Sequence, residues 1–157
     1  MAWSATLGFA ASERSITATA RSALQRLADR GLLRLVERPV ELADPGTAWA
    51  ALRTGGSTAE RQAARQLRAD NDRRLAAAFA ELDLIATPTT PNPPHGHHGP
   101  GARMSVALTW AFNLSGHPAV SLPAGLTPDG EPVGLQLVGR HGGEGLLLAV
   151  AAQHEAA

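Results

Sequence analysis

The stretch that decides the fold is residues 113–148, which read NLSGHPAVSLPAGLTPDGEPVGLQLVGRHGGEGLLL. Two short apolar runs, Ala119–Leu126 and Val133–Val138, flank the tetrapeptide TPDG at 127–130. In that tetrapeptide the proline presets one φ angle and the final glycine tolerates a positive φ, as a tight turn requires. The pattern therefore predicts a strand, a turn and a second strand.

Neither predicted strand has a charged face, so we expect both of their sides to be covered, as in a sheet with helices over it. Pro123, Pro132 and Gly134 interrupt the two runs. Proline and glycine within a strand mark a bulge, a strand start or a close approach of another segment. These positions predict irregular strands rather than a plain ladder.

The composition narrows the class of protein. A chain of 157 residues with 44% hydrophobic residues is long enough for one globular domain with a core. A formal net charge of +0 gives no electrostatic reason to expect nucleic acid or an anionic membrane as a partner. There is no cysteine, no apolar run of membrane-spanning length and no signal-peptide pattern, so we expect a cytoplasmic protein without disulfides or cysteine-based zinc sites.

Arginine supplies all 14 basic residues, and lysine is absent. Arginine stays protonated and cannot act as a general base. A mechanism that needs a neutral lysine therefore cannot be run by this chain alone.

Outside the central stretch, hydrophobic periodicity, capping signals and glycine or proline breaks predict further strands and helices. The predicted strands lie in residues 1–10, at 32–36 and at 83–88. The predicted helices run from a cap at Ser12 to Gly31, from Asp44 and Pro45 to Arg53, from a capping box at Ser57 and Glu60 to about Leu82, from 103 to 114, and from 146 to 155.

The longest of these helices has one apolar and one charged face. The charged face interleaves arginines with acids, which favours a solvated helix surface over a basic binding face. The residues expected on the apolar face are Ala63, Leu67, Leu75, Ala78, Phe79 and Leu82.

Residues 89–101, TTPNPPHGHHGPG, are too rich in proline and glycine for regular structure, and they carry His95, His97 and His98. Imidazoles are common metal ligands, but a stable site also needs further ligands that are held rigidly. We therefore favour a solvated loop over a metal site, and we predict no resident metal and no cofactor.

Two other positions allow a functional and a structural interpretation. Ser57 follows a glycine pair, as a nucleophile near an oxyanion-binding loop would, but its capping box with Glu60 already explains it. His117, between Gly116 and Pro118, is interpreted as a hydrogen-bonded turn histidine rather than a ligand contact. We predict no catalytic residue.

Three segments and a final helix occur in an order that resembles the C-terminal half of amidase signature enzymes. The segments are AWSATLGFA at 2–10, DLIATPTTP at 83–91 and NLSGHPAVSLPAGLTPDGEPVGLQLVGR at 113–140, followed by a Gly-Gly-Glu that leads into the helix. The resemblance implies a three-layer α/β/α fold around a large mixed sheet, with residues 1–157 forming only the C-terminal part of that domain. In such a sheet, the turn at 128–130 need not pair the two central strands directly.

The same resemblance implies hydrolysis of carboxylic amides by a Ser, cis-Ser, Lys triad, whose residues and Gly/Ser-rich signature lie in the N-terminal half. This sequence shows neither that signature nor a lysine, so no catalytic residue carries over. The family segment that matches Ala107–Asn113 borders the acyl pocket. Trp110, Phe112 and Asn113 are therefore the residues expected to form a pocket wall.

The expected function is that of the C-terminal portion of an amidase, which completes the sheet and shapes the pocket but is inactive alone. Its expected partners are a small-molecule amide and a complementing N-terminal polypeptide. The alternative is a non-catalytic subunit or self-associating scaffold, a homo-oligomer that pairs through an exposed sheet edge. Neither hypothesis involves nucleic acid or a membrane.

Overall fold

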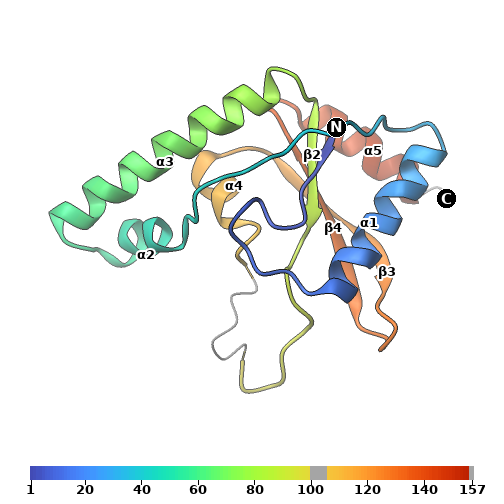
Figure 1. Cartoon of the computed structure of the whole chain (residues 1–157), viewed down its shortest axis with the longest axis horizontal. Helices are drawn as coiled ribbons and strands as arrows, with labels where there is room; N and C mark the ends of the chain where they lie inside the picture. Colours follow the sequence, from blue (N-terminus) through green and yellow to red (C-terminus); the bar gives the residue numbers. More distant parts are fainter. Residues whose placement is uncertain (100–105, 156–157) are drawn as a thin grey trace.

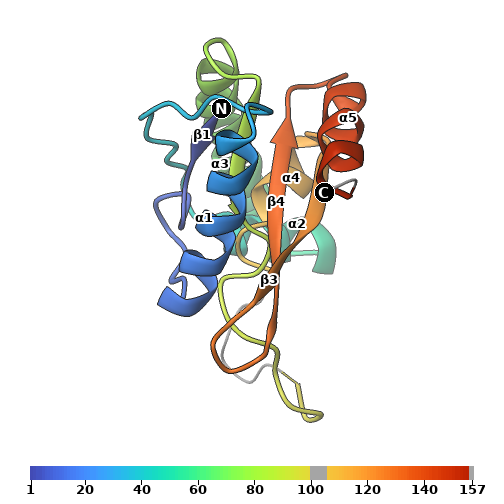
Figure 2. The same ribbon diagram turned by 90° about the vertical axis from the view of Figure 1, so that its right-hand side faces the viewer.

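The computed structural model describes residues 1–99 and 106–155 of the chain. A mixed sheet of strand order β1-β2-β4-β3 runs through it, with β1 parallel to β2 and the other pairs antiparallel. Helices α1 and α5 lie on one side of this sheet, and α2, α3 and α4 lie on the other (Figure 1, Figure 2). The three-layer α/β/α arrangement is the one expected. The elements are β1 (Ala2–Trp3), α1 (Arg14–Asp29), α2 (Gly46–Thr54), α3 (Thr58–Phe79), β2 (Leu84–Pro88), α4 (Trp110–Ser115), β3 (Ala119–Leu126), β4 (Pro132–Gly139) and α5 (Glu144–Glu155).

The central stretch forms a β-hairpin. Ala119 is the register partner of Val138, and Leu126 is that of Pro132. In the turn, the Gly130 N–H donates to the Thr127 carbonyl (2.9 Å), and Gly130 has a φ of +83°. The predicted strand, turn and strand are confirmed. We expected that the strands on either side of the turn need not pair with each other. In the structure, β3 and β4 pair along their length.

The predicted irregularities of the two strands are also present. The register shifts between Pro123 and Gly125, which leaves Ala124 as an unpaired bulge residue on the edge strand β3. The Ala124 carbonyl accepts a hydrogen bond from Arg26 Nη2 of α1 (2.9 Å), and the Pro123 carbonyl lies 2.8 Å from His154 Nε2 of α5. Two side chains thus bond the carbonyls around the bulge.

Each face of the sheet has its own core. The core beneath α1 and α5 includes Leu24, Leu135 and Leu147, and the core beneath α3 and α4 includes Leu75 and Phe112. The expectation that both sides of both strands are covered holds for β4, which is buried along most of its length. It is wrong for β3: the side chains of Ala119, Ser121 and Pro123 point to the same face of the sheet and are exposed, so this face is not covered along β3.

The structure corrects two predictions in the first third of the chain. Ser12 does not cap α1: the helix begins two residues later, and Ser12 Oγ donates to the Ala5 carbonyl (2.7 Å). Residues 32–36 are not a strand, although the Met1 ammonium donates to the Arg34 carbonyl (2.9 Å) and the Val36 N–H donates to the Met1 carbonyl (3.0 Å). The neighbouring strand β1 is too short to extend this pairing into a ladder.

The α2–α3 pair forms an arm that extends away from the sheet (Figure 1). The predicted capping box is confirmed: Ser57 Oγ accepts from the Glu60 N–H (3.3 Å), and Glu60 Oε2 accepts from the Ser57 N–H (2.7 Å). α2 begins one residue later than expected, with Pro45 at its N-cap. α3 ends at Phe79 rather than near Leu82.

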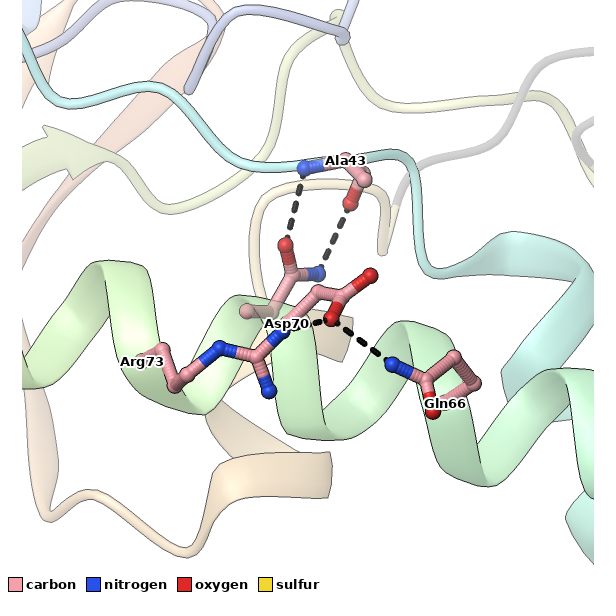
Figure 3. Close-up of polar contacts among 5 residues, drawn as sticks. Ala43, Gln66, Asp70 and Arg73 are labelled. Carbon is pink, nitrogen blue, oxygen red and sulfur yellow. Dashed lines mark hydrogen bonds and ion pairs between the residues drawn. The ribbon is translucent and has the colours of Figure 1, made fainter.

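The apolar face of α3 differs from the prediction. Leu75 and Phe79 are buried as expected, but Ala63 is exposed, whereas Ala64 and Asn71 are buried. The side-chain amide of Asn71 bonds the backbone of Ala43, and Figure 3 shows these two bonds beside the exposed contacts of Asp70. The buried polar residue Asn71 therefore hydrogen-bonds the segment that precedes α2, and this accounts for a polar side chain on the buried face of α3.

The last two helices were predicted with approximate bounds. α4 starts at Trp110, after a turn at 106–109, and the first residues of the predicted 103–114 helix lie outside the described part. α5 begins at Glu144, two residues before the predicted start. Residues 89–99 have no regular structure, as expected, and residues 100–101 of that predicted loop are not described. No described helix combines the length and the apolar character that crossing a membrane needs.

Candidate functional site

A band of polar side chains crosses the sheet. Gln136 of β4 is the register partner of both Thr87 in β2 and Ser121 in β3, so these three residues form one row across the strands. Thr89 follows β2, and its N–H donates to the Gly134 carbonyl (2.9 Å). We call Thr87, Thr89, Ser121 and Gln136 the polar band.

The polar band lies on the face that α3 and α4 cover in part. Side chains two residues apart in a strand share a face of the sheet. Ile85 and Val138, which are two residues from Thr87 and Gln136, belong to the core beneath α3 and α4. The same face is therefore apolar under the helices and polar next to them.

Exposure increases along the polar band. Thr87 and Gln136 are buried, Thr89 is half-buried, and Ser121 is exposed. Thr89 Oγ1 and Ser121 Oγ lie 2.6 Å apart, as a hydrogen-bonded pair of hydroxyls. One hydroxyl proton is used in that bond, so the pair retains one O–H donor and free lone pairs for an outside group.

Gly134 makes this hydroxyl pair possible. A Cβ atom at position 134 would lie 2.6 Å from Thr89 Oγ1 and 2.7 Å from Ser121 Oγ. Any side chain there would occupy the space of the two hydroxyl groups. The sequence marked Gly134 as a bulge, a strand start or a close approach of backbone; in the structure, side-chain atoms of Thr89 and Ser121 approach it.

Gln136 connects the polar band to the residues expected to form the pocket wall. Its Nε2 donates to Thr87 Oγ1 (2.9 Å) and to the Leu108 carbonyl (3.1 Å). Leu108 lies in the turn that leads into α4. A buried amide that is bonded to two segments therefore fixes the start of α4 against the sheet.

The three expected wall residues share α4 but lie in different environments. Phe112 is buried in the core with Leu75 and Phe79, as its sequence context favoured. Trp110 is also buried, and it stacks on Trp49 of α2 at 6.4 Å between ring centroids. Only Asn113 is exposed. The structure thus brings these residues onto one short helix, with one side chain accessible.

Helix α2 holds Trp110 from the outside. A Cβ atom at Gly46 would lie 2.4 Å from Cζ3 of Trp110, so the start of α2 packs directly on the indole. The Arg53 guanidinium lies 4.9 Å from the ring of Trp49, on which Trp110 stacks. Within the described residues, the buried Trp110 Nε1 has no hydrogen-bond partner.

His117, which directly follows α4 and Gly116, is half-buried at the end of that helix. Its Nδ1 lies 2.7 Å from Ser115 Oγ, which fits the predicted hydrogen-bonded turn histidine. Its ring stacks on Phe79 (4.9 Å between centroids) and lies 4.0 Å from the ring of His141. The pKa of His117 is lowered, first by burial and then by the neighbouring His141, while Asp72 acts in the opposite direction.

The other candidates have structural surroundings. Ser57 and Glu60 use each other in the capping box, and this bonding lowers the pKa of the Glu60 carboxyl. A cleft of about 370 Å³ between α2 and α3 is lined largely by alanines. In the loop, the rings of His97 and His98 meet edge to face at 5.9 Å. Within residues 1–99 and 106–155, no group of three or more His, Cys, Asp or Glu is arranged to hold a metal.

Sequence reasoning did not single out the polar band. Its signal was present, because Thr87, Ser121 and Gln136 are polar residues inside otherwise apolar strands. Grouping them requires the strand order and the register of three strands that are distant in sequence. Chemically, the accessible part of the band offers the Thr89 and Ser121 hydroxyl groups, which suit the recognition of a neutral polar ligand.

The chain has clear relatives. A family model described as Amidase matches residues 2–148. The chain is 53% identical over 57 residues to the 6-aminohexanoate-cyclic-dimer hydrolase of Paenarthrobacter ureafaciens. The aligned region is 36% of this chain and 12% of that protein. It is 39% identical over 112 residues to a glutamyl-tRNA(Gln) amidotransferase subunit of Synechococcus sp. (strain CC9902). That aligned region is 68% of this chain and 23% of the subunit.

The fold has matching solved structures. A bacterial aryl acylamidase of the amidase signature enzymes superposes with a TM-score of 0.76 at 21% identity, over 99% of this chain and 42% of that one. The chain therefore spans less than half the length of this structural relative, and about a quarter or less of the two curated relatives above. The family match over nearly the whole sequence shows that this chain belongs to the amidase family.

Proposed function

We propose that this chain forms the C-terminal portion of an amidase-family hydrolase that acts on carboxylic amide C–N bonds. The observation that carries the proposal is the family match over residues 2–148. In this proposal, residues 1–157 form a partial domain, which supplies strands of the central sheet and one wall of the substrate pocket.

The pocket wall in this proposal consists of α4 and the neighbouring polar band. Trp110 and Phe112 give the wall its apolar mass, while Asn113 and the Thr89–Ser121 hydroxyl pair supply its accessible polar groups. An amide carbonyl accepts from a hydroxyl donor, and an amide N–H donates to a hydroxyl lone pair. The wall thus combines an apolar surface with a few polar groups, as small-molecule pockets do.

By this proposal the chain does not hydrolyse amides by itself. It has no lysine to serve as the base of the family triad. Ser57, the serine at a glycine pair, is bonded to Glu60 at a helix start. Purified chain is therefore expected to leave propionamide and benzamide unhydrolysed above the buffer rate, and Ser57→Ala is expected to change nothing in that assay.

The positive test is a chimera. The segment of a 6-aminohexanoate cyclic dimer hydrolase that superposes on this chain, which is 44% of that hydrolase and covers 99% of this chain, is replaced by residues 1–157. Turnover of the cyclic dimer of 6-aminohexanoate is then measured. The proposal expects measurable hydrolysis, with a KM that rises in an Asn113→Ala chimera. Glu37→Ala, an exposed change on a different segment, is the matched control.

Two outcomes contradict the proposal. Turnover by the isolated chain that is lost in Ser57→Ala would show that the chain carries its own nucleophile. A chimera with native circular dichroism and melting behaviour but no turnover would show that these residues do not complete the enzyme.

A second candidate function is that of a non-catalytic, self-associating scaffold. The observation that favours it is the exposure of large apolar side chains on α5 and at the end of β3, with Leu148 at 66% and Leu126 at 64% exposed. The amidotransferase relative is itself named as one subunit of its enzyme. Sedimentation equilibrium that gives a dimer, with dissociation in Leu148→Glu, would support this function; a monomer at all concentrations would exclude it.

A further inference from the structure

Three elements on the α3–α4 side of the sheet meet at a pair of histidines. His117 follows α4, His141 follows β4, and Phe79 ends α3. The two imidazole rings lie 4.0 Å apart between centroids and are tilted by 31°. On its other side, His117 stacks on Phe79 at 4.9 Å with an interplanar angle of 17°. His117 is thus held between an aromatic ring and a second titratable ring.

The groups that face His117 come from all of these segments. From α4, Ser115 Oγ lies 2.7 Å from Nδ1 of His117. From α3, the Asp72 carboxylate exerts an attractive charge on His117, and Asp72 itself lies 3.8 Å from Arg68. Asp72 Oδ1 is buried and has no hydrogen-bond partner among the described residues. From the β4–α5 turn, the titratable group that acts on His117 is His141.

This arrangement suits neutral rings better than charged ones. Two imidazolium groups about 4 Å apart repel each other, and the half-buried position removes part of the water that would solvate them. The carboxylate that attracts a charged His117, Asp72, also lies 3.8 Å from Arg68. Protonation of the pair is therefore unfavourable while the rings stay in contact.

We propose that His117 and His141 form a proton-sensitive latch, which holds the β4–α5 turn against the end of α4 when neutral and releases it when protonated. A backbone hydrogen bond joins the same two segments, because the Gly139 N–H donates to the Pro118 carbonyl (2.9 Å). Release would expose this hydrogen bond to solvent and loosen the end of the helix that carries Trp110 and Phe112. The proposal concerns the folded chain itself and does not depend on amide hydrolysis.

The direction of the pH effect follows from the pKa of His117, which folding lowers mainly through burial. A histidine with a lower pKa in the folded than in the unfolded state binds fewer protons when folded. Its contribution to stability is complete above the pKa of the unfolded histidine. That contribution is lost as the pH falls from there through the folded pKa, so the latch opens on the acidic side of neutrality.

The direct test is an NMR titration of the histidine C–H resonances in the folded chain. We expect His117 to titrate below the ordinary pKa of a histidine. His141→Gln, an exposed substitution, removes the repelling ring and is expected to raise the midpoint of His117. Asp72→Asn removes the attracting charge and is expected to lower it. A midpoint of His117 at or above the ordinary pKa of a histidine, or one unaffected by His141→Gln, overturns the proposal.

Hydrogen exchange of the Gly139 amide tests whether the β4–α5 turn separates from the end of α4. After correction for intrinsic rates, we expect the Gly139 amide to lose protection as the pH falls from neutral through the folded pKa of His117, both in the unmodified chain and in the control His97→Gln. In His141→Gln the loss is expected to be smaller, because the second charge is absent. Equal loss in His141→Gln and in the control shows that the histidine pair does not control this segment and overturns the proposal.

Discussion

Asn71 and Ala43 are joined through both backbone groups of Ala43: its N–H donates to Asn71 Oδ1 (2.8 Å), and its carbonyl accepts from Asn71 Nδ2 (2.9 Å; Figure 3). This pair fixes the extended segment before α2 against the middle of α3. Asn71 is 3% exposed, so its side-chain amide makes these bonds out of contact with bulk water.

We expect Asn71→Ala to lower the free energy of unfolding by about 1–3 kcal/mol, because it removes both hydrogen bonds from the half-buried backbone N–H and carbonyl of Ala43. Gln66→Ala is the matched control, since Gln66 bonds Asp70 on the exposed face of the same helix (3.1 Å). The control is expected to stay within about 0.5 kcal/mol of the unmodified chain. Urea unfolding of both variants measures the difference, and equal stability would contradict the structural role of Asn71.

A second prediction concerns Gly134 beneath the hydroxyl pair. Gly134→Ala places a methyl group 2.6 Å from Thr89 Oγ1, and we expect a loss of about 1–3 kcal/mol from overpacking. At Gly145 in α5, an added Cβ meets nothing within 4 Å, so Gly145→Ala is expected to be neutral or stabilising by up to about 1 kcal/mol. Thermal and urea unfolding distinguish the two, and a partial rescue of Gly134→Ala by Thr89→Ala would identify the clash.

Two neighbouring residues of α4 are expected to affect the stability of the chain differently, because Phe112 is buried and Asn113 is exposed. Phe112→Ala empties a core position that is 2% exposed, and we expect it to cost about 3–5 kcal/mol. Asn113→Ala changes the exposed neighbour and is expected to change stability by less than about 0.5 kcal/mol. Comparable losses in both variants would mean that Asn113 is not free to face a ligand.

The capping box of α3 should respond to acid. The bond with the Ser57 side chain, followed by that with the Ser57 backbone, lowers the pKa of Glu60. The bonded, ionised form is therefore fully present above the pKa of an unfolded glutamate and is lost as the pH falls through the lower folded pKa. Backbone NMR shifts at residues 58–61 are expected to change in that acidic range in the unmodified chain and to stay constant in Glu60→Ala. An unchanged titration in Ser57→Ala would contradict the assigned cause.

Local signals in the sequence predicted local structure well. The turn at 127–130, the capping box at Ser57 and the bulge next to Pro123 each depend on residues that are adjacent or a few positions apart. The strand at 83–88 was also found, because a buried strand reads as a continuous apolar run.

Features that depend on tertiary neighbours were missed. Ser12 has the chemistry of a helix cap, but the carbonyl of Ala5 takes its hydroxyl instead. Asn71 gives no apolar signal, and its burial follows only from the position of Ala43. The polar band needs the register of β2, β4 and β3 at the same time, and periodicity within a single strand does not contain that information.

The carbonyl contacts around the β3 bulge limit where a further strand can be added to the edge of the sheet. Arg26 and His154 occupy the carbonyls of Ala124 and Pro123. In the described part of the chain, no backbone segment bonds the outer side of residues 119–122. A strand contributed by another polypeptide would therefore have to enter at the Ala119 end of β3 and stop before Pro123, which sets the length and the starting point of any such addition.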